Sequence, residues 1–190
     1  MVCARPAESG SAVGDDVAVK GTVTEFNGLT EINSNAAGVT RCGAGSPITA
    51  TTVHLPESVE GELERYEGML VNIPETLTVS EVFNLGRFGE TMLAADGRLI
   101  QPTNFLAPSN APGSPAQQEF DSILRRKILL DDGLNIQNPN PIPYLSADNT
   151  RRLGDTVNGL TGILDFRFSE YRVQPTIAPV FTVVNPRPAS

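Results

Sequence analysis

Apolar and polar residues alternate along residues 66–98, the longest stretch of the chain with few strand breakers. The apolar positions recur at a spacing of two, at Met69, Val71, Ile73, Leu77 and Val79. A period of two is typical of a β-strand with one buried face, and threonine and valine favour that pleated surface. The pattern predicts two paired strands at the centre of the chain.

A strong hairpin signal lies in the first part of the chain. Residues 17–26 alternate as one strand up to Asn27-Gly28, and residues 29–32 return. Asn-Gly between two alternating runs is typical of a two-residue turn, because both positions require positive φ. The sequence therefore predicts a hairpin at this point.

The segment that follows has weaker patterns. Residues 33–47 are rich in Asn, Ala, Gly and Ser and predict an irregular loop, whereas residues 48–55 predict one strand. Several glutamates come next, and no Asp/Asn/Gly loop spacing accompanies them, so a solvated linker explains them better than a cation site. The sequence places a domain boundary at residue 65.

One helix is predicted. Ser114-Pro115-Ala116-Gln117 combines a capping serine, a proline at the first helical position and a glutamine three residues after the cap. These are the residues with which helices begin. We expect the helix to end near Arg126 and to run into a strand over residues 127–130.

Two segments of the chain resemble each other. Gly14-Asp15-Asp16-Val17 and Gly154-Asp155-Thr156-Val157 each continue through a glycine into an aromatic-ended strand, a tight turn and a return strand. An internal repeat accounts for the likeness, and each copy would form the last hairpin of a five-stranded OB barrel.

The predicted fold class is mainly β: an OB-fold-like five-stranded barrel with one helix, preceded by a partial second OB-like unit. The complete barrel would use strands over residues 69–82, 89–95, 127–130, 155–168 and 171–174. The partial unit would use residues 2–5, 17–26 and 29–32 as strands three to five. The expected domains are 1–65, which ends in the acidic linker, 66–176 for the barrel, and 177–190 for a linker.

Several spaced motifs also resemble one family. They are Tyr66-Glu67-Gly68-Met69-Leu70-Val71, Leu77-Thr78-Val79-Ser80-Glu81-Val82, Leu85-Gly86-Arg87-Phe88-Gly89-Glu90, Arg98-Leu99-Ile100-Gln101-Pro102-Thr103-Asn104, Leu130-Asp131-Asp132-Gly133 and Gly154-Asp155-Thr156-Val157. In this order they are similar to the non-catalytic region of secreted bacterial nucleases of the ExeM/NucH type. The resemblance implies OB-like accessory domains before a metal-dependent endonuclease/exonuclease/phosphatase domain, which this chain lacks. One departure is that an OB helix normally lies between strands three and four, whereas the predicted helix precedes strand three.

The net charge of the chain limits how it could bind nucleic acid. The formal net charge of −8 argues against broad neutralisation of duplex phosphates, because counterion release needs clustered cations. However, 12 of the 14 basic residues are arginine, whose planar fork binds phosphate or carboxylate through two hydrogen bonds. We take Arg87, Phe88, Arg167 and Arg172 as the candidate nucleic-acid contacts.

The last predicted hairpin gives the most specific prediction about a binding site. With a turn at Ser169-Glu170, Arg167 would lie opposite Arg172. Like charges directly opposed across a sheet are unfavourable, so an anion should lie between them. That anion is either a carboxylate of this chain or a DNA phosphate.

The sequence shows no catalytic signature, so we predict no catalytic residue, metal site or cofactor in this chain. His54 is the only histidine, and no serine or cysteine has a recognisable nucleophile context. The two cysteines are not accompanied by the further Cys or His residues that a zinc site needs. Cys3 and Cys42 are either a disulfide or two small buried apolar residues.

The resulting expectation is an accessory OB-fold region of a secreted, extracellular nuclease that positions single- or double-stranded DNA for a catalytic domain of the same protein. The alternative is an interdomain spacer without nucleic-acid contact. No apolar run approaches the roughly 20 residues of a membrane span, so no membrane partner is expected. The opening residues lack a signal-peptide pattern, and we expect the chain to be a piece of a longer protein.

Overall fold

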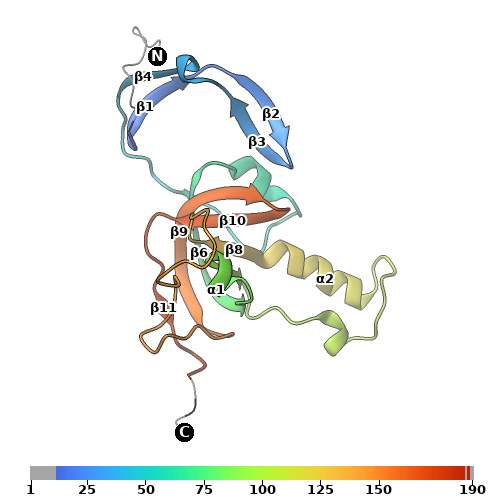
Figure 1. Ribbon diagram of the computed structural model, residues 1–190. Coiled ribbons are helices and arrows are strands. Elements are labelled where there is room, and N and C mark those ends of the chain that lie inside the picture. The colour runs from blue at the N-terminus through green and yellow to red at the C-terminus, as the bar shows by residue number, and fades with distance from the viewer. Residues whose placement is uncertain (1–11, 187, 189–190) are drawn as a thin grey trace. The chain divides into compact units, whose positions relative to one another are not determined.

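The computed structural model describes residues 12–186 and residue 188. Its contacts divide the chain into two units, one formed by residues 1–49 with 167–169 and the other by residues 50–166 with 170–190. Both consist mainly of β-strands, which confirms the predicted fold class (Figure 1). The strand predicted over residues 2–5 lies outside the described residues, as does Cys3.

Five strands of the second unit close into a barrel. β6 (Leu70–Glu81) pairs antiparallel with β7 (Glu90–Ala94), which pairs antiparallel with β8 (Lys127–Asp131). β8 runs parallel to β10 (Glu170–Pro175), and β10 neighbours β9 (Thr156–Arg167), which returns antiparallel to β6. This closed order, with one parallel pair inside it, is the arrangement of an OB barrel.

Alternate residues of the five strands fill the barrel. The fully buried side chains include Ile73, Leu77, Leu93, Leu130, Leu164 and Val173. Val53, Leu55 and Leu63 join the same cluster. Residues 50–65, which the sequence places at the end of the first unit, therefore pack in the barrel unit because their apolar side chains belong to its core.

The helix α2 (Pro115–Arg126) forms as predicted. Ser114 Oγ accepts a hydrogen bond from Gln117 N at 3.3 Å, and Pro115 occupies the first helical turn. The helix leads directly into β8, so it precedes the third barrel strand. The expected departure from the usual OB position is therefore confirmed.

Three short elements differ from the predictions. The strand expected over residues 48–55 is reduced to β5 (Thr51–Thr52), because the segment pairs with β6 only at Val71 and Asn72. The connection between the strands expected over residues 69–82 and 89–95 contains a short helix, α1 (Leu85–Phe88), which was not expected. The expected linker over residues 177–190 contains β11 (Phe181–Thr182), which pairs with β9.

The predicted turn between β9 and β10 is wrong by one residue. The strands end at Arg167 and resume at Glu170, so Phe168 and Ser169 form the turn, with φ of 53° and 62°. A two-residue turn there places Arg167 opposite Glu170 and Arg172 opposite Asp165. The two arginines are not paired across the hairpin.

The described part of the first unit, residues 12–49, contains four strands in two small sheets. β1 (Asp15–Val19) pairs with β4 (Val39–Ala44), and β2 (Thr22–Phe26) pairs with β3 (Leu29–Asn33) through the predicted Asn-Gly hairpin. A short 3₁₀ turn, η1 (Ala36–Gly38), precedes β4. Two further 3₁₀ turns, η2 (Glu62–Tyr66) and η3 (Pro102–Asn104), belong to the second unit.

Two predictions for this unit are wrong. Residues 17–26 are not one strand, because β1 ends at Val19 and β2 begins at Thr22. Between them, a Cβ atom on Gly21 would lie only 2.5 Å from Asn33 O, so a glycine is needed there. Residues 33–47 are not an irregular loop, because β4 lies within them. Its partner β1 is distant in sequence, so its local composition does not predict the pairing.

Candidate functional site

The outer face of β7, β8 and β10 contains several charged side chains. Leu93, Leu130 and Val173 are fully buried in the core. Because successive side chains of a strand point to opposite faces, their neighbours Arg172 and Asp131 lie on the outer face. Arg172 is one of the predicted nucleic-acid contacts.

Arg172 is held by two carboxylates from other strands. Its Nη1 atom lies 2.7 Å from Glu90 Oε1 and 2.5 Å from Asp131 Oδ2, and the residue is only 3% exposed. The anion beside this arginine is therefore a carboxylate pair of the chain itself, one of the two options left open by the sequence. A phosphate would have to displace both carboxylates to bind here.

Nearby cations of the barrel are also bound within the chain. Lys127 Nζ lies 2.6 and 2.7 Å from the two carboxylate oxygens of Glu170. Arg126 Nη1 donates to Ala95 O and Gly97 O, both at 3.1 Å, and the residue is 8% exposed. The basic side chains along β8 and β10 are thus used to hold the barrel together.

Arg87 and Phe88 lie together on α1, the short helix between β6 and β7. The Arg87 guanidinium lies 5.3 Å from the centre of the Phe88 ring, and its Nη2 donates to Gln137 Oε1 at 3.2 Å. Arg87 is exposed, and the described residues provide no carboxylate partner for it. Of the predicted contacts, this pair is the most accessible within the barrel unit.

Gly89 ends α1 in the left-handed region, with φ of 70°. A Cβ atom there would lie 2.2 Å from Asp132 Oδ2, so the glycine allows this carboxylate to pack against the helix end. Burial raises the pKa of Asp132, and the charges of Asp131 and Glu90 raise it further. The outer face is therefore acidic beside α1.

The fourth candidate, Arg167, is the last residue of β9 and belongs by its contacts to the first unit. The structure brings Arg87 and Phe88 together but does not unite the four candidates in one site. Cys42 lies half-buried on β4, and its bridge to Cys3 stays one of the two options that the sequence leaves open, because Cys3 lies outside the described residues.

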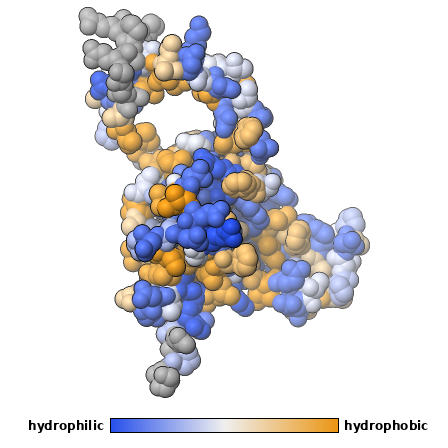
Figure 2. Space-filling view, viewed as in Figure 1, coloured by the Kyte–Doolittle hydropathy of each residue, from blue (hydrophilic) through white to orange (hydrophobic). Residues whose placement is uncertain are grey.

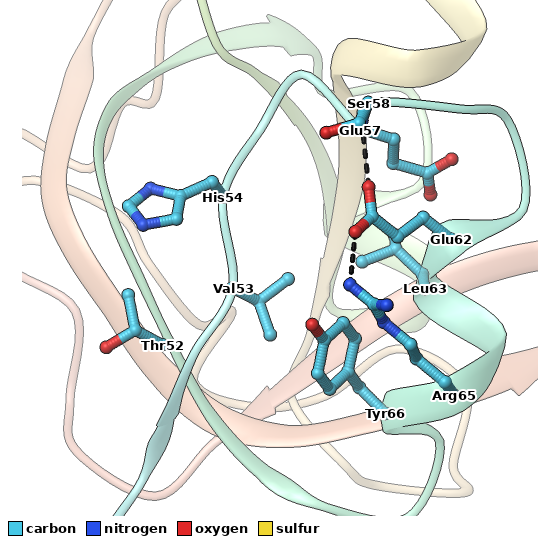
Figure 3. Close-up of a pocket in the computed structure, with 9 residues that line it drawn as sticks. All are labelled: Thr52, Val53, His54, Glu57, Ser58, Glu62, Leu63, Arg65 and Tyr66. Atoms are coloured by element: carbon cyan, nitrogen blue, oxygen red, sulfur yellow. Dashed lines mark hydrogen bonds and ion pairs between the residues drawn. The ribbon is translucent and has the colours of Figure 1, made fainter.

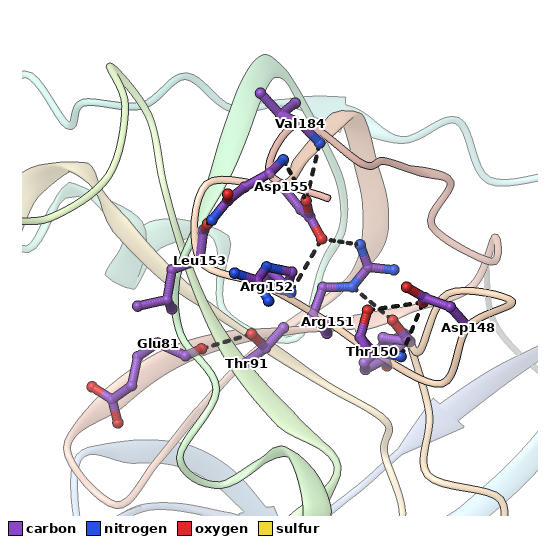
Figure 4. Close-up of polar contacts among 11 residues, drawn as sticks. Glu81, Thr91, Asp148, Thr150, Arg151, Arg152, Leu153, Asp155 and Val184 are labelled. Carbon is purple, nitrogen blue, oxygen red and sulfur yellow. Dashed lines mark hydrogen bonds and ion pairs between the residues drawn. The ribbon is translucent and has the colours of Figure 1, made fainter. Parts of the chain in front are cut away.

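Sequence reasoning missed the role of Asp155, a buried carboxylate that accepts several hydrogen bonds (Figure 4). Its Oδ2 atom accepts hydrogen bonds from Arg151 Nη1 at 2.9 Å and Arg152 N at 3.1 Å. Its Oδ1 atom accepts from Val184 N at 3.0 Å. Asp155 is 1% exposed, so it fastens the segment after β11 to the start of β9. The Gly-Asp pair in the internal repeat was the available signal.

Arg151 is fixed from three sides. Besides Asp155, it donates through Nε to Tyr144 O at 2.8 Å, and its guanidinium lies 3.9 Å from the centre of the Phe181 ring. Burial raises the pKa of Tyr144 well above its usual range. Arg151 therefore links the loop at Tyr144 and the strand β11 to the start of β9.

A small pocket lies beside η2 and is lined by residues that include His54, Glu57, Glu62, Arg65 and Tyr66 (Figure 3). Its volume is about 170 Å³. Pockets that bind ordinary small ligands measure roughly 300–1,000 Å³ and are mainly apolar. The Glu62 carboxylate accepts hydrogen bonds from Ser58 N and from Arg65, so these polar groups of the lining already bind one another.

No catalytic or metal constellation emerges in the part of the chain that the structure describes. His54 Nδ1 lies 2.6 Å from Glu75 Oε1, and its side chain is 70% exposed. Residues 12–186 contain no group of three or more His, Cys, Asp or Glu side chains that could hold a metal ion. Among the described helices, none is long and apolar enough to cross a membrane.

Residues 57–185 match the model of a protein family described as a domain of unknown function, DUF8508. The chain belongs to this family. The matched residues comprise the complete barrel, including α1, α2 and the Asp155 cluster. No curated protein and no solved structure matches the chain.

Proposed function

We propose that this DUF8508 chain is a non-catalytic scaffold region of a secreted nuclease of the ExeM/NucH type. The sequence motifs over residues 66–157 support the family resemblance. The observation that carries the scaffold role is the pairing of Arg172 with Glu90 and Asp131. A barrel that fills its outer face with internal ion pairs is suited to hold a neighbouring domain, not to bind phosphate.

The magnitude of the charge supports the same role. Binding to nucleic acid derives much of its affinity from lysine and arginine that neutralise phosphates. Here the net charge is −8, and Lys127 and Arg172 are each bound to carboxylates of the chain. A phosphate would therefore be repelled by the net negative charge of the chain and would also have to displace those carboxylates.

The test is binding and cleavage by the purified 190-residue chain. Fluorescence anisotropy with labelled single-stranded and duplex DNA between 20 and 200 mM NaCl, about the range over which phosphate contacts change most, should show no saturable binding. Incubation with Mg²⁺, Mn²⁺ or Ca²⁺ should show no cleavage. A DNA-binding constant whose logarithm falls linearly with the logarithm of the salt concentration would overturn the scaffold role. Metal-dependent cleavage would overturn the proposal that the chain is non-catalytic.

DNA positioning is the second candidate, favoured by the segment before β7. Phe83 is 87% exposed, and the exposed Arg87 lies four residues further on beside Phe88. An exposed ring and a cation over a second ring are the groups on which single-stranded bases stack. If the chain binds single-stranded DNA, Phe83→Ala should weaken the binding, whereas Phe105→Ala, at an exposed ring outside this segment, should not.

A further inference from the structure

The first unit repeats the last part of the barrel in three dimensions. Gly14 and Gly154 precede corresponding aspartates and have φ of 94° and 95°. Asp15 N donates to Ala12 O at 3.0 Å, and its carboxylate accepts from Ala12 N at 2.7 Å. Asp155 makes the same two bonds with the residue three positions before it, at 3.2 and 3.1 Å.

The likeness continues into the hairpins. A Cβ atom on Gly21 would lie 2.5 Å from Asn33 O, and one on Gly162 would lie 2.2 Å from Gln174 O. Both glycines thus let the return strand approach closely. The second copy is one residue longer between its glycines, and Gly159 lies there with φ of 69°. The register of β9 against β6 shifts at this glycine, where two residues of β6 lie opposite one residue of β9.

Aligning the two segments on their corresponding glycines pairs the apolar positions of one with those of the other. Val157, Leu160, Leu164 and Val173 line the barrel core and are each no more than 1% exposed. Their counterparts in the first unit are Val17, Val19, Val23 and Ile32, with exposures of 39%, 44%, 66% and 54%. Positions that build a core in one copy therefore lie at the surface in the other. Figure 2 shows apolar residues at the surface of this unit.

The strand pairings identify what covers these positions in the barrel. β9 is flanked by β10 and β11 on one side and by the long strand β6 on the other. In the first unit β3 and β4 take the places of β10 and β11. No strand within residues 12–49 takes the place of β6, and the corresponding edges of β1 and β2 have no strand partner there.

We infer that residues 12–49 form an acceptor site for one extended strand with the pattern of β6. Such a strand would pair with the edges of β1 and β2 and place alternate apolar side chains on Val17, Val19, Val23 and Ile32. Backbone hydrogen bonds supply affinity in this mode of recognition, and the apolar positions supply register. The occupant is an alternating strand and not a charged ligand, because the surface to be covered is apolar.

The probe is a fluorescent peptide with the sequence of residues 70–81, LVNIPETLTVSE, added to the full chain. The barrel already contains its own β6, so the first unit is the site left for the peptide. The test variant combines Val17→Asp and Val23→Asp, both at exposed positions. The matched control is Thr22→Asp, which changes the adjacent, exposed position on the opposite face of β2.

Saturable binding to the wild-type chain and to Thr22→Asp, at least tenfold weaker in the double variant, is the expected result. Amide exchange in residues 15–26 should slow when the peptide is bound. Absence of binding, or equal binding by the double variant, would overturn the inference. Sedimentation of the chain alone adds a further outcome, because self-association abolished by the double variant would mean that a second copy occupies the face instead.

Discussion

The Arg151 guanidinium lies 2.9 Å from the Asp155 carboxylate, and the two side chains are 3% and 1% exposed. Removing one partner of a buried ion pair leaves the other charge without compensation, which costs about 3–5 kcal/mol. Asp155→Asn should therefore lower the free energy of unfolding by about this amount, as measured by urea denaturation.

Asp148→Asn is the matched control for that change. Asp148 is exposed and accepts hydrogen bonds from Thr150 only two residues away. This variant should melt close to the wild-type temperature. Equal destabilisation by both variants would contradict a special role for Asp155.

Arg172→Gln should destabilise the barrel because it leaves Glu90 and Asp131 close together without their cation. We expect a loss of about 3–5 kcal/mol in the free energy of unfolding, measured by chemical denaturation. Arg87→Gln, on the exposed side of α1, should have little effect. If the Arg172→Gln variant retained wild-type stability, these ion pairs would not be structurally important.

Asp132 should contribute a pH dependence. Its pKa in the folded protein is raised above the ordinary value of 3.8, mainly by burial. The charged form therefore disfavours folding at neutral pH, and this cost disappears as pH falls through the raised folded pKa toward the unfolded value. Asp132→Asn, which keeps an acceptor for Leu134 N, should gain a few tenths to about 1 kcal/mol at pH 7.

The gain from Asp132→Asn should shrink between pH 7 and pH 4, about the unfolded pKa of an aspartate. Thermal melts of both proteins across that range measure it. A gain that stayed constant with pH would show that the amide acts through packing and not through loss of charge.

Gly162→Ala should be costly, because the new Cβ atom would lie 2.2 Å from Gln174 O and 2.7 Å from Val173 Cγ1. Overpacking of this kind costs about 1–3 kcal/mol, and here the neighbour is a strand backbone that cannot rotate away. Gly86→Ala is the control, since no atom lies within 4 Å of the added Cβ. Equal melting temperatures for the two variants would contradict the close approach of β9 and β10.

Local signals predicted the elements whose causes are local. Ser114 and Pro115 fixed the start of α2, and Asn27-Gly28 fixed the β2–β3 turn. The β9–β10 turn was misplaced because Phe168 and Ser169 adopt positive φ, which a phenylalanine seldom does.

The site depends more on distant contacts than the strands do. Arg172 was identified as an arginine in need of an anion, but its partners Glu90 and Asp131 come from two other strands. No spacing in the sequence links these three residues, because the antiparallel β7–β8 pairing sets Glu90 opposite Asp131 and the parallel β8–β10 pairing adds Arg172. Asp155 was noticed only as part of a repeat, since its main-chain donors at 184 and 185 have no side-chain signature.

The β6–β9 pairing also affects how the barrel is made. Leu70 pairs with Ile163, so about half of the 190-residue chain separates the strands that close the ring. Contacts this distant slow folding, because the intervening loop must be ordered before they form. During synthesis β6 emerges long before β9, so the apolar side chains of β6 stay without their β9 neighbours until β9 is made. A ribosome-bound chain that ends before residue 156 should therefore be protease-sensitive throughout the barrel, and protection should arise in one step once both β9 and β10 have emerged.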